Sequence, residues 1–143
     1  MSKIHYKSVE EIALIRESSL LVSKTLGEIA KVIGPGVKTI DLNKLAETYI
    51  RDNGGVPAFL NYHGFPYSLC ISLNDQVVHG FPGNRELIEG DLVSVDCGAE
   101  LNGFIGDSAY TFAIGEVSEQ VKTLMRVTME CLDLGVQKAP NNS

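Results

Sequence analysis

Apolar residues in the first part of the chain recur at the spacing of an α-helix. Between residues 8 and 33 they stand at Ile12, Ile15, Val22, Leu26, Ile29 and Ile33. This spacing predicts a long amphipathic helix. Ser8 followed by Glu11 matches a capping box at the start of the helix. Gly34-Pro35-Gly36 follows the last apolar position and is expected to end it.

Two further segments show the same helical spacing. One begins after Thr39, ends at Asn53-Gly54-Gly55, and carries on its apolar face Leu42, Leu45, Ala46, Tyr49 and Ile50. The other is capped by Ser118 and runs to about Lys138, and its apolar face carries Val121, Leu124, Met125, Thr128 and Leu132. Three amphipathic helices are therefore predicted.

The middle of the chain changes to short apolar runs separated by Gly, Pro, Asn and Asp, a pattern typical of strands and hairpins. Ser68–Leu73 and Gln76–His79 flank Asn74-Asp75, which predicts a hairpin in which Cys70 faces His79. Such a pair is either a nucleophilic cysteine with its base or a buried cysteine beside a core histidine. The second interpretation is favoured, because nothing near Cys70 in the sequence would lower its pKa.

A second hairpin is predicted further along the chain. Leu92–Leu101 and Phe104–Ala113 flank Asn102-Gly103, a dipeptide suited to the positive φ angles of a type I′ turn. The order helix, helix, strands, helix predicts one α+β domain over residues 1–143, with antiparallel hairpins packed against about three helices. A chain of 143 residues is long enough to bury such a core.

The turn at Asn102-Gly103 places Asp96 and Asp107 on one side of the sheet. The numbers of cross-strand partners then sum to 205, so Asp107 faces Gly98 and Asp96 faces Ala109. Directly opposed residues share a face, which makes the two aspartates diagonal neighbours. With no side chain on Gly98, we expect room for an ion between them.

Two carboxylates on one strand face either point to solvent or bind a cation. Aspartate is depleted in strands, and like charges on one face are destabilising unless something offsets them. Carboxylate oxygens are ligands of divalent cations, and paired carboxylates are typical of two-metal hydrolytic centres. We therefore predict a divalent metal site at Asp96 and Asp107.

Composition and charge narrow the classes of function. The net charge is −6 and the basic residues are scattered, which disfavours binding to nucleic acid. The charged N-terminal segment does not resemble a signal peptide, and no apolar run approaches the ~18 residues of a membrane span, so a cytoplasmic location is expected. The widely spaced Cys70, Cys97 and Cys131 are expected to be reduced thiols.

A set of short motifs runs through the middle of the chain. They are Tyr62-His63-Gly64-Phe65-Pro66, then Ser68, Cys70, Ser72 and Asn74, then His79-Gly80 and Pro82, then Gly90-Asp91 and Asp96, then Gly103 and Gly106-Asp107. Together they resemble the type I methionine aminopeptidases. That family has the pita-bread fold, in which two similar halves enclose a dinuclear metal site. The resemblance extends from the first predicted helix to the third and implies the first half of that fold.

The resemblance also implies roles for individual residues. Asp96 would chelate one of two divalent ions and Asp107 would bridge both, the metal being cobalt, manganese, iron or zinc. His79 would contact the scissile amide and stabilise the tetrahedral species. The pocket for the methionine side chain would be lined by Tyr62, Phe65 and Cys70. His63 would lie at the rim of the site.

The second half of the family's fold has no counterpart in this sequence. That half supplies the remaining metal ligands, whereas after Cys131 the sole acidic residue is Asp133 and there is no histidine. Two carboxylates are too few to hold two ions, so an isolated monomer is expected to show weak or no metal binding and activity. Truncation would leave apolar surface exposed, and a two-fold homodimer is a specific hypothesis for covering it.

Three functions follow as hypotheses. The resemblance implies metal-dependent removal of the initiator methionine from nascent polypeptides. A catalytically silent half-domain that binds a partner or oligomerises is the alternative, which the missing ligands favour and the presence of Asp96, Asp107 and His79 disfavours. A cysteine hydrolase using Cys70 and His79 is a minor third, which would be insensitive to chelators.

Overall fold

The computed structural model describes residues 4–139, and its first two helices lie where the sequence predicts them. α1 spans Val9–Val32 and α2 spans Thr39–Asp52. At the start of α1, the Ser8 N–H donates to Glu11 Oε2 (2.8 Å) and the Glu11 N–H donates to Ser8 Oγ (3.2 Å). The predicted capping box is therefore confirmed.

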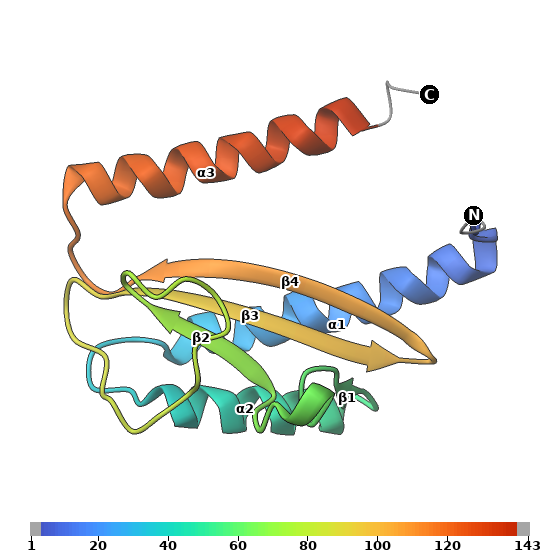
Figure 1. The fold of residues 1–143 in the computed structure, drawn as a ribbon, viewed down its shortest axis with the longest axis horizontal. Helices are drawn as coiled ribbons and strands as arrows, with labels where there is room; N and C mark the ends of the chain where they lie inside the picture. The colour runs from blue at the N-terminus through green and yellow to red at the C-terminus, as the bar shows by residue number, and fades with distance from the viewer. Residues whose placement is uncertain (1–3, 140–143) are drawn as a thin grey trace.

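Four antiparallel strands form one sheet around β3 (Leu92–Leu101) (Figure 1). β3 pairs along its whole length with β4 (Phe104–Ala113). Two shorter strands, β1 (Val56–Pro57) and β2 (Leu69–Leu73), pair with different stretches of β3. A one-turn 3-10 helix, η1 (Tyr62–Gly64), lies in the connection between β1 and β2.

The core lies between one face of this sheet and the helices α1 and α2 (Figure 1). β3 contributes alternate residues to it, namely Val93, Val95, Cys97 and Ala99, each fully buried. These positions alternate with Asp96, as the period of two in a strand requires. α1 comes very close to β4 at Gly106, where a Cβ would lie 2.6 Å from the backbone of Ser18 and Ser19, so a larger residue would push α1 away.

The predicted strand at Gln76–His79 is wrong. Val78 and His79 have φ angles of 36° and 55°, which an extended strand does not allow. β2 pairs with β3 instead, and Cys70 faces Asp96 rather than His79. The ten-residue β3 offers β2 a continuous ladder, whereas residues 74–91 form a loop that returns to β2 at Gly80.

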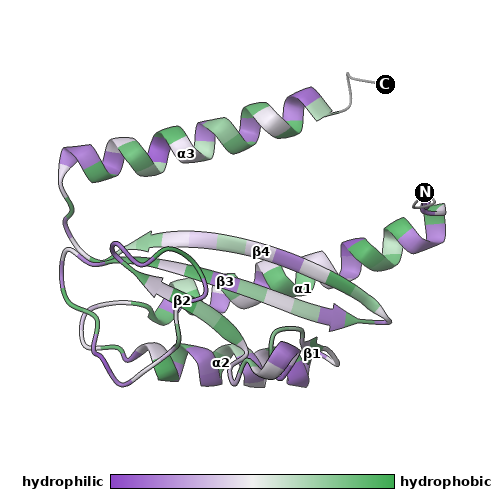
Figure 2. Cartoon of the chain, in the orientation of Figure 1, coloured by the Kyte–Doolittle hydropathy of each residue, from purple (hydrophilic) through white to green (hydrophobic). Residues whose placement is uncertain are grey.

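α3 (Glu119–Lys138) runs apart from the sheet and the other two helices (Figure 1). Its N-terminal cap is the predicted one, because Ser118 Oγ accepts from the Val121 N–H (3.3 Å). None of its residues is buried, and apolar positions recur along its length (Figure 2). A hollow of about 660 Å³ separates it from the sheet, with a lining that includes Ser94, Thr111, Met125 and Leu132.

Three helices and an antiparallel sheet confirm the predicted α+β class. One face of the sheet is covered by α1 and α2, while the other face carries Asp96 and Asp107. Within residues 4–139, no helix combines the length and the apolar character that crossing a membrane requires.

Candidate functional site

Asp96 in β3 and Asp107 in β4 lie on the same face of the sheet, as predicted. Asp96 pairs with Ala109, and Asp107 pairs with Gly98. The turn between the strands has the positive φ angles of a type I′ turn, 54° at Asn102 and 79° at Gly103. The two carboxylates are therefore diagonal neighbours on the face opposite the core, Asp96 half-buried and Asp107 exposed.

The surroundings of Asp96 disfavour its ionised form. Burial raises the pKa of the Asp96 carboxyl and the charge of Asp107 raises it further, whereas the charge of His79 lowers it. Asp107 and His79 therefore both lie within electrostatic reach of Asp96. A divalent cation between the carboxylates would offset their repulsion.

The space over Gly98 is filled by an aromatic ring. A Cβ on Gly98 would lie 2.6 Å from Phe59 Cε1, and the Ala58 N–H donates to Gly98 O (2.9 Å). The space that the missing side chain of Gly98 leaves is therefore taken by the Phe59 ring. No signal in the sequence points to Phe59, because its contact with Gly98 joins segments that are remote in the chain. A cation at Asp107 would lie beside this ring.

Cys70 borders the carboxylates from β2, directly opposite Asp96. Burial, together with the charges of Asp96 and Asp107, raises the pKa of the Cys70 thiol to about 11. A nucleophilic cysteine requires a lowered pKa, so this environment disfavours the cysteine hydrolase hypothesis. A protonated thiol is instead suited to line an apolar pocket.

His79 approaches the carboxylates from the loop at residues 74–91. The next residue, Gly80, is held against β2 by two hydrogen bonds. Its N–H donates to Ser72 Oγ (3.0 Å), and its carbonyl oxygen accepts from the Ile71 N–H (2.9 Å). A Cβ on Gly80 would collide with the carbonyl oxygen of Ile71, so only glycine fits there. The imidazole therefore extends from backbone that is fixed to the sheet.

The predicted pocket residues Tyr62, His63 and Phe65 lie in the connection that follows Phe59. The Tyr62 N–H donates to Phe59 O (3.0 Å), which links η1 to the ring over Gly98. The rings of Tyr62 and His63 meet edge-on, with centroids 4.4 Å apart, and both side chains are exposed. This connection therefore reaches the carboxylate face through Phe59.

Phe65 belongs to a cluster of three aromatic rings that is not predicted from the sequence. Its centroid lies 5.2 Å from that of Phe81 and 6.0 Å from that of Tyr67, and the rings of Tyr67 and Phe81 are 5.6 Å apart. Phe81 follows His79 by two residues. The cluster therefore joins the Phe65 segment to the loop that carries His79. The only signal in the sequence is the aromatic residue directly after His79-Gly80.

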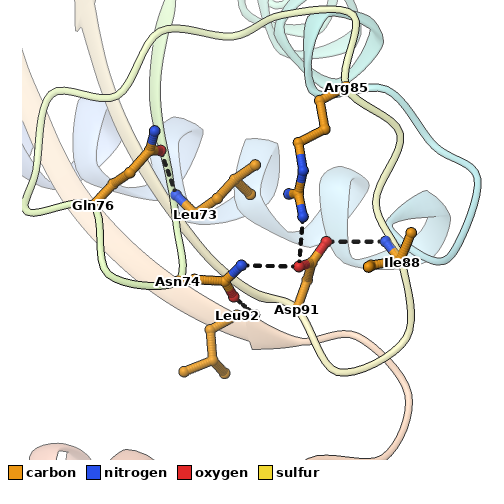
Figure 3. Close-up of polar contacts among 7 residues, drawn as sticks. All are labelled: Leu73, Asn74, Gln76, Arg85, Ile88, Asp91 and Leu92. Carbon is orange, nitrogen blue, oxygen red and sulfur yellow. Dashed lines mark hydrogen bonds and ion pairs between the residues drawn. The ribbon is translucent and has the colours of Figure 1, made fainter.

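A polar network around Asp91 joins the two ends of that loop (Figure 3). Asp91 Oδ1 accepts from Arg85 Nη2 (2.9 Å) and Asn74 Nδ2 (3.0 Å), and its Oδ2 accepts from the Ile88 N–H (3.0 Å). Asn74 Oδ1 accepts from the Leu92 N–H (2.9 Å). The hydrogen bond from Arg85 is the main cause that lowers the pKa of Asp91 to about 2. The hydrogen bonds of Asp91 and Asn74 therefore hold together the start of the loop, after β2, and its end, before β3.

The donor set suits a divalent cation in kind but not in number. Asp96 and Asp107 supply carboxylate oxygens, the ligands that such ions take. Within residues 4–139, no group of three or more His, Cys, Asp or Glu side chains is placed to hold a metal ion. The described residues therefore fit part of a metal centre, and a complete centre requires ligands from elsewhere.

Comparisons with known proteins support the resemblance found in the sequence. The profile of metallopeptidase family M24 matches residues 13–142. The chain is 48% identical to a methionine aminopeptidase of Clostridium acetobutylicum and 45% identical to one of Clostridium perfringens, over 93% of this chain in both cases. The crystal structure of a methionine aminopeptidase from Thermotoga maritima superposes on 92% of this chain with a TM-score of 0.87 and 39% identity.

The chain spans about half the length of these relatives. The matches cover 54% and 53% of the two clostridial proteins and 53% of the Thermotoga chain. Its three helices and antiparallel sheet correspond to about half of the pita-bread fold of such structures. The chain therefore belongs to metallopeptidase family M24.

Proposed function

We propose that this chain forms the first half of a metal-dependent enzyme that removes the N-terminal methionine from nascent polypeptides in the cytoplasm. The observation that carries the proposal is that Asp96 and Asp107 share one face of the sheet and that the charge of His79 acts on Asp96. The names of its relatives support the same activity. Since the chain spans about half of those relatives, we assign the activity to the assembled protein.

Asp96 and Asp107 supply two of the metal ligands in this proposal. Both carboxylates would hold divalent ions in the assembled protein, the metal being cobalt, manganese, iron or zinc. When bound, divalent ions supply the Lewis acidity that polarises the carbonyl of the first peptide bond. The raised pKa of Asp96 is consistent with two carboxylates whose mutual repulsion a bound cation would offset.

The remaining residues bind and orient the substrate. His79 contacts the scissile amide and stabilises charge that develops there. Cys70, Tyr62 and Phe65 line the pocket for the methionine side chain, for which thiol and aromatic groups are suited, and His63 lies at its rim. The protonated state of Cys70 keeps an additional charge out of that pocket.

Calorimetric titration of the purified chain with Mn²⁺ tests the proposal, with a methionyl-peptide cleavage assay beside it. We expect weak binding that Asp96→Asn and Asp107→Asn each abolish. Asp133→Asn, which removes an exposed carboxylate from α3, is the matched control and should leave binding unchanged. Binding that survives in both site variants would contradict the assignment of the two ligands.

A second candidate is a catalytically silent module that binds a partner or a second copy of the chain. Two observations favour it: no third metal ligand joins the two aspartates within residues 4–139, and α3 has no buried residue. An absence of both metal binding and cleavage, together with self-association, would support this candidate over the enzyme.

A further inference from the structure

Ser72 is a buried polar residue on the same face as the two aspartates, and its hydroxyl does not bond within the sheet. It lies in β2 two residues after Cys70 and opposite Ser94 of β3. Only 5% of the surface of Ser72 is exposed. Its Oγ accepts a hydrogen bond from the Gly80 N–H at 3.0 Å. A buried hydroxyl normally has a partner, and here the partner is the backbone of the loop that carries His79.

The backbone on the N-terminal side of this bond is strained. Val78 has a φ of 36° and His79 a φ of 55°. Positive φ is rare for a β-branched residue such as valine, and such conformations persist where the surroundings over-determine them. The surroundings in this case are the bonds that hold Gly80 against β2. The two residues with positive φ therefore directly precede Gly80, the residue that Ser72 holds in place.

Two other contacts hold the same segment, and they differ in kind from the contact of Ser72. The Ile71 N–H donates to the Gly80 carbonyl, a backbone bond that no side-chain substitution removes. Phe81 packs against Phe65 and Tyr67 on the other side of Gly80. Ser72 thus connects Gly80, the residue after His79, directly to the strand beside Asp96 through its side chain. The other side-chain bond between this loop and β2, from the Leu73 N–H to Gln76 Oε1, lies three residues before His79.

The geometry points to Ser72 as the positioning residue for His79: its hydroxyl anchors Gly80 and so sets where the imidazole stands over the face of Asp96 and Asp107. Ser72 bonds to backbone, and its role is exerted through His79. The inference rests on the proposed function for its catalytic consequence. The placement of the imidazole is a structural claim that can be measured without turnover.

The test compares Ser72→Ala with Ser94→Ala in the full chain by nuclear magnetic resonance. Ser94 is the matched control because it faces Ser72 across the strands and its Oγ bonds to Thr111 Oγ1 (2.9 Å), away from the loop. The chain has three histidines, so the ring signals of His5 and His63 serve as internal references. The two readouts are the ring signals of His79 and the hydrogen exchange of the Gly80 amide.

We expect Ser72→Ala to shift the His79 ring signals while those of His5 and His63 stay in place, and to accelerate exchange of the Gly80 amide at least tenfold. Ser94→Ala should change neither. If Ser72→Ala, like Ser94→Ala, changes neither the His79 ring signals nor the exchange of the Gly80 amide, the inference is wrong.

A second variant keeps the test decisive should Ser72→Ala fail to fold. Gly80→Ala acts from the loop and leaves every side chain of β2 unchanged. Its methyl group would collide with the Ile71 carbonyl oxygen and displace the same anchor. It should move the His79 ring signals in the same manner, and an unmoved ring would overturn the inference. Since neither readout needs metal or turnover, an inactive chain would count against the proposed function alone.

Discussion

Cys70 and Asp96 are direct partners across β2 and β3, on the sheet face that also carries Asp107. Burial raises the pKa of the Cys70 thiol, and the charges of Asp96 and Asp107 raise it further, to about 11. The cross-strand partner of Cys70 is therefore Asp96, whereas the sequence suggests His79. The Cys70 thiol is therefore protonated at neutral pH and is not a nucleophile in this site.

Neutralising Asp96 should make Cys70 more reactive. At pH 8 the thiolate fraction is small because the pKa is about 11, and Asp96→Asn removes one cause of that rise while burial remains. We expect alkylation of Cys70 by iodoacetamide to accelerate about threefold, consistent with a charge effect of a fraction of a pKa unit. Mass spectrometry of the peptides measures the rate. Cys131 is exposed and serves as the internal reference, and an unchanged ratio of the two rates would contradict the prediction.

Asp91→Asn should destabilise the fold at neutral pH and much less in acid. The pKa of Asp91 is lowered to about 2, so its ionised form stabilises the folded chain above the unfolded pKa, ~3.9, and this contribution is lost as the pH falls through about 2. We expect the free energy of unfolding at pH 7 to drop by about 1–2 kcal/mol, since Asp91 is buried while Arg85 is partly exposed. Urea unfolding at pH 7 and pH 2 measures both values. An equal loss at the two pH values would show that charge is not the cause.

Local chemistry explains which parts of the fold the sequence predicts. The register of β3 and β4 follows from the turn at Asn102-Gly103 and from the alternation of apolar residues, and all of its predicted pairs are present. The cap at Ser8 with Glu11 is likewise local, because both partners lie within one helical turn. These features depend on residues that are close together in the chain, so they can be predicted from the sequence alone.

The errors concern contacts between distant segments. Asn74-Asp75 resembles a hairpin turn, but the neighbour of β2 is β3, whose pairing depends on the fold as a whole. The ring of Phe59 over Gly98 and the anchoring of Gly80 at Ser72 are also non-local. Asp96 and Asp107 were found because they share one hairpin, whereas the position of His79 beside them depends on a loop with strained φ angles.

In the absence of metal, Asp107→Asn should stabilise the chain. The charge of Asp107 helps to raise the pKa of Asp96 in the folded state, so ionisation of Asp96 costs stability above that pKa and the cost is relieved as the pH falls through it. Removing the repulsion should raise the free energy of unfolding at pH 7 by about 0.5 kcal/mol. Urea unfolding in EDTA measures it, with Asp133→Asn as the control. A loss of stability in Asp107→Asn would contradict repulsion between the two carboxylates.

The exposed apolar residues of α3 predict self-association, which the homodimer hypothesis requires. Leu124 and Leu132 are 61% and 62% exposed, and no residue of α3 is buried. Burying one such leucine stabilises an interface by about 1–2 kcal/mol, so a row of them supports association at micromolar concentration. Leu132→Glu should shift the chain to a monomer in sedimentation velocity experiments. Thr123→Glu adds the same charge at an exposed polar position of the helix and should leave the assembly in place. An interface of this kind should be populated at about 50 micromolar protein. A parent chain that sediments as a monomer at that concentration would rule out the homodimer. The apolar residues of α3 would then be covered by another polypeptide.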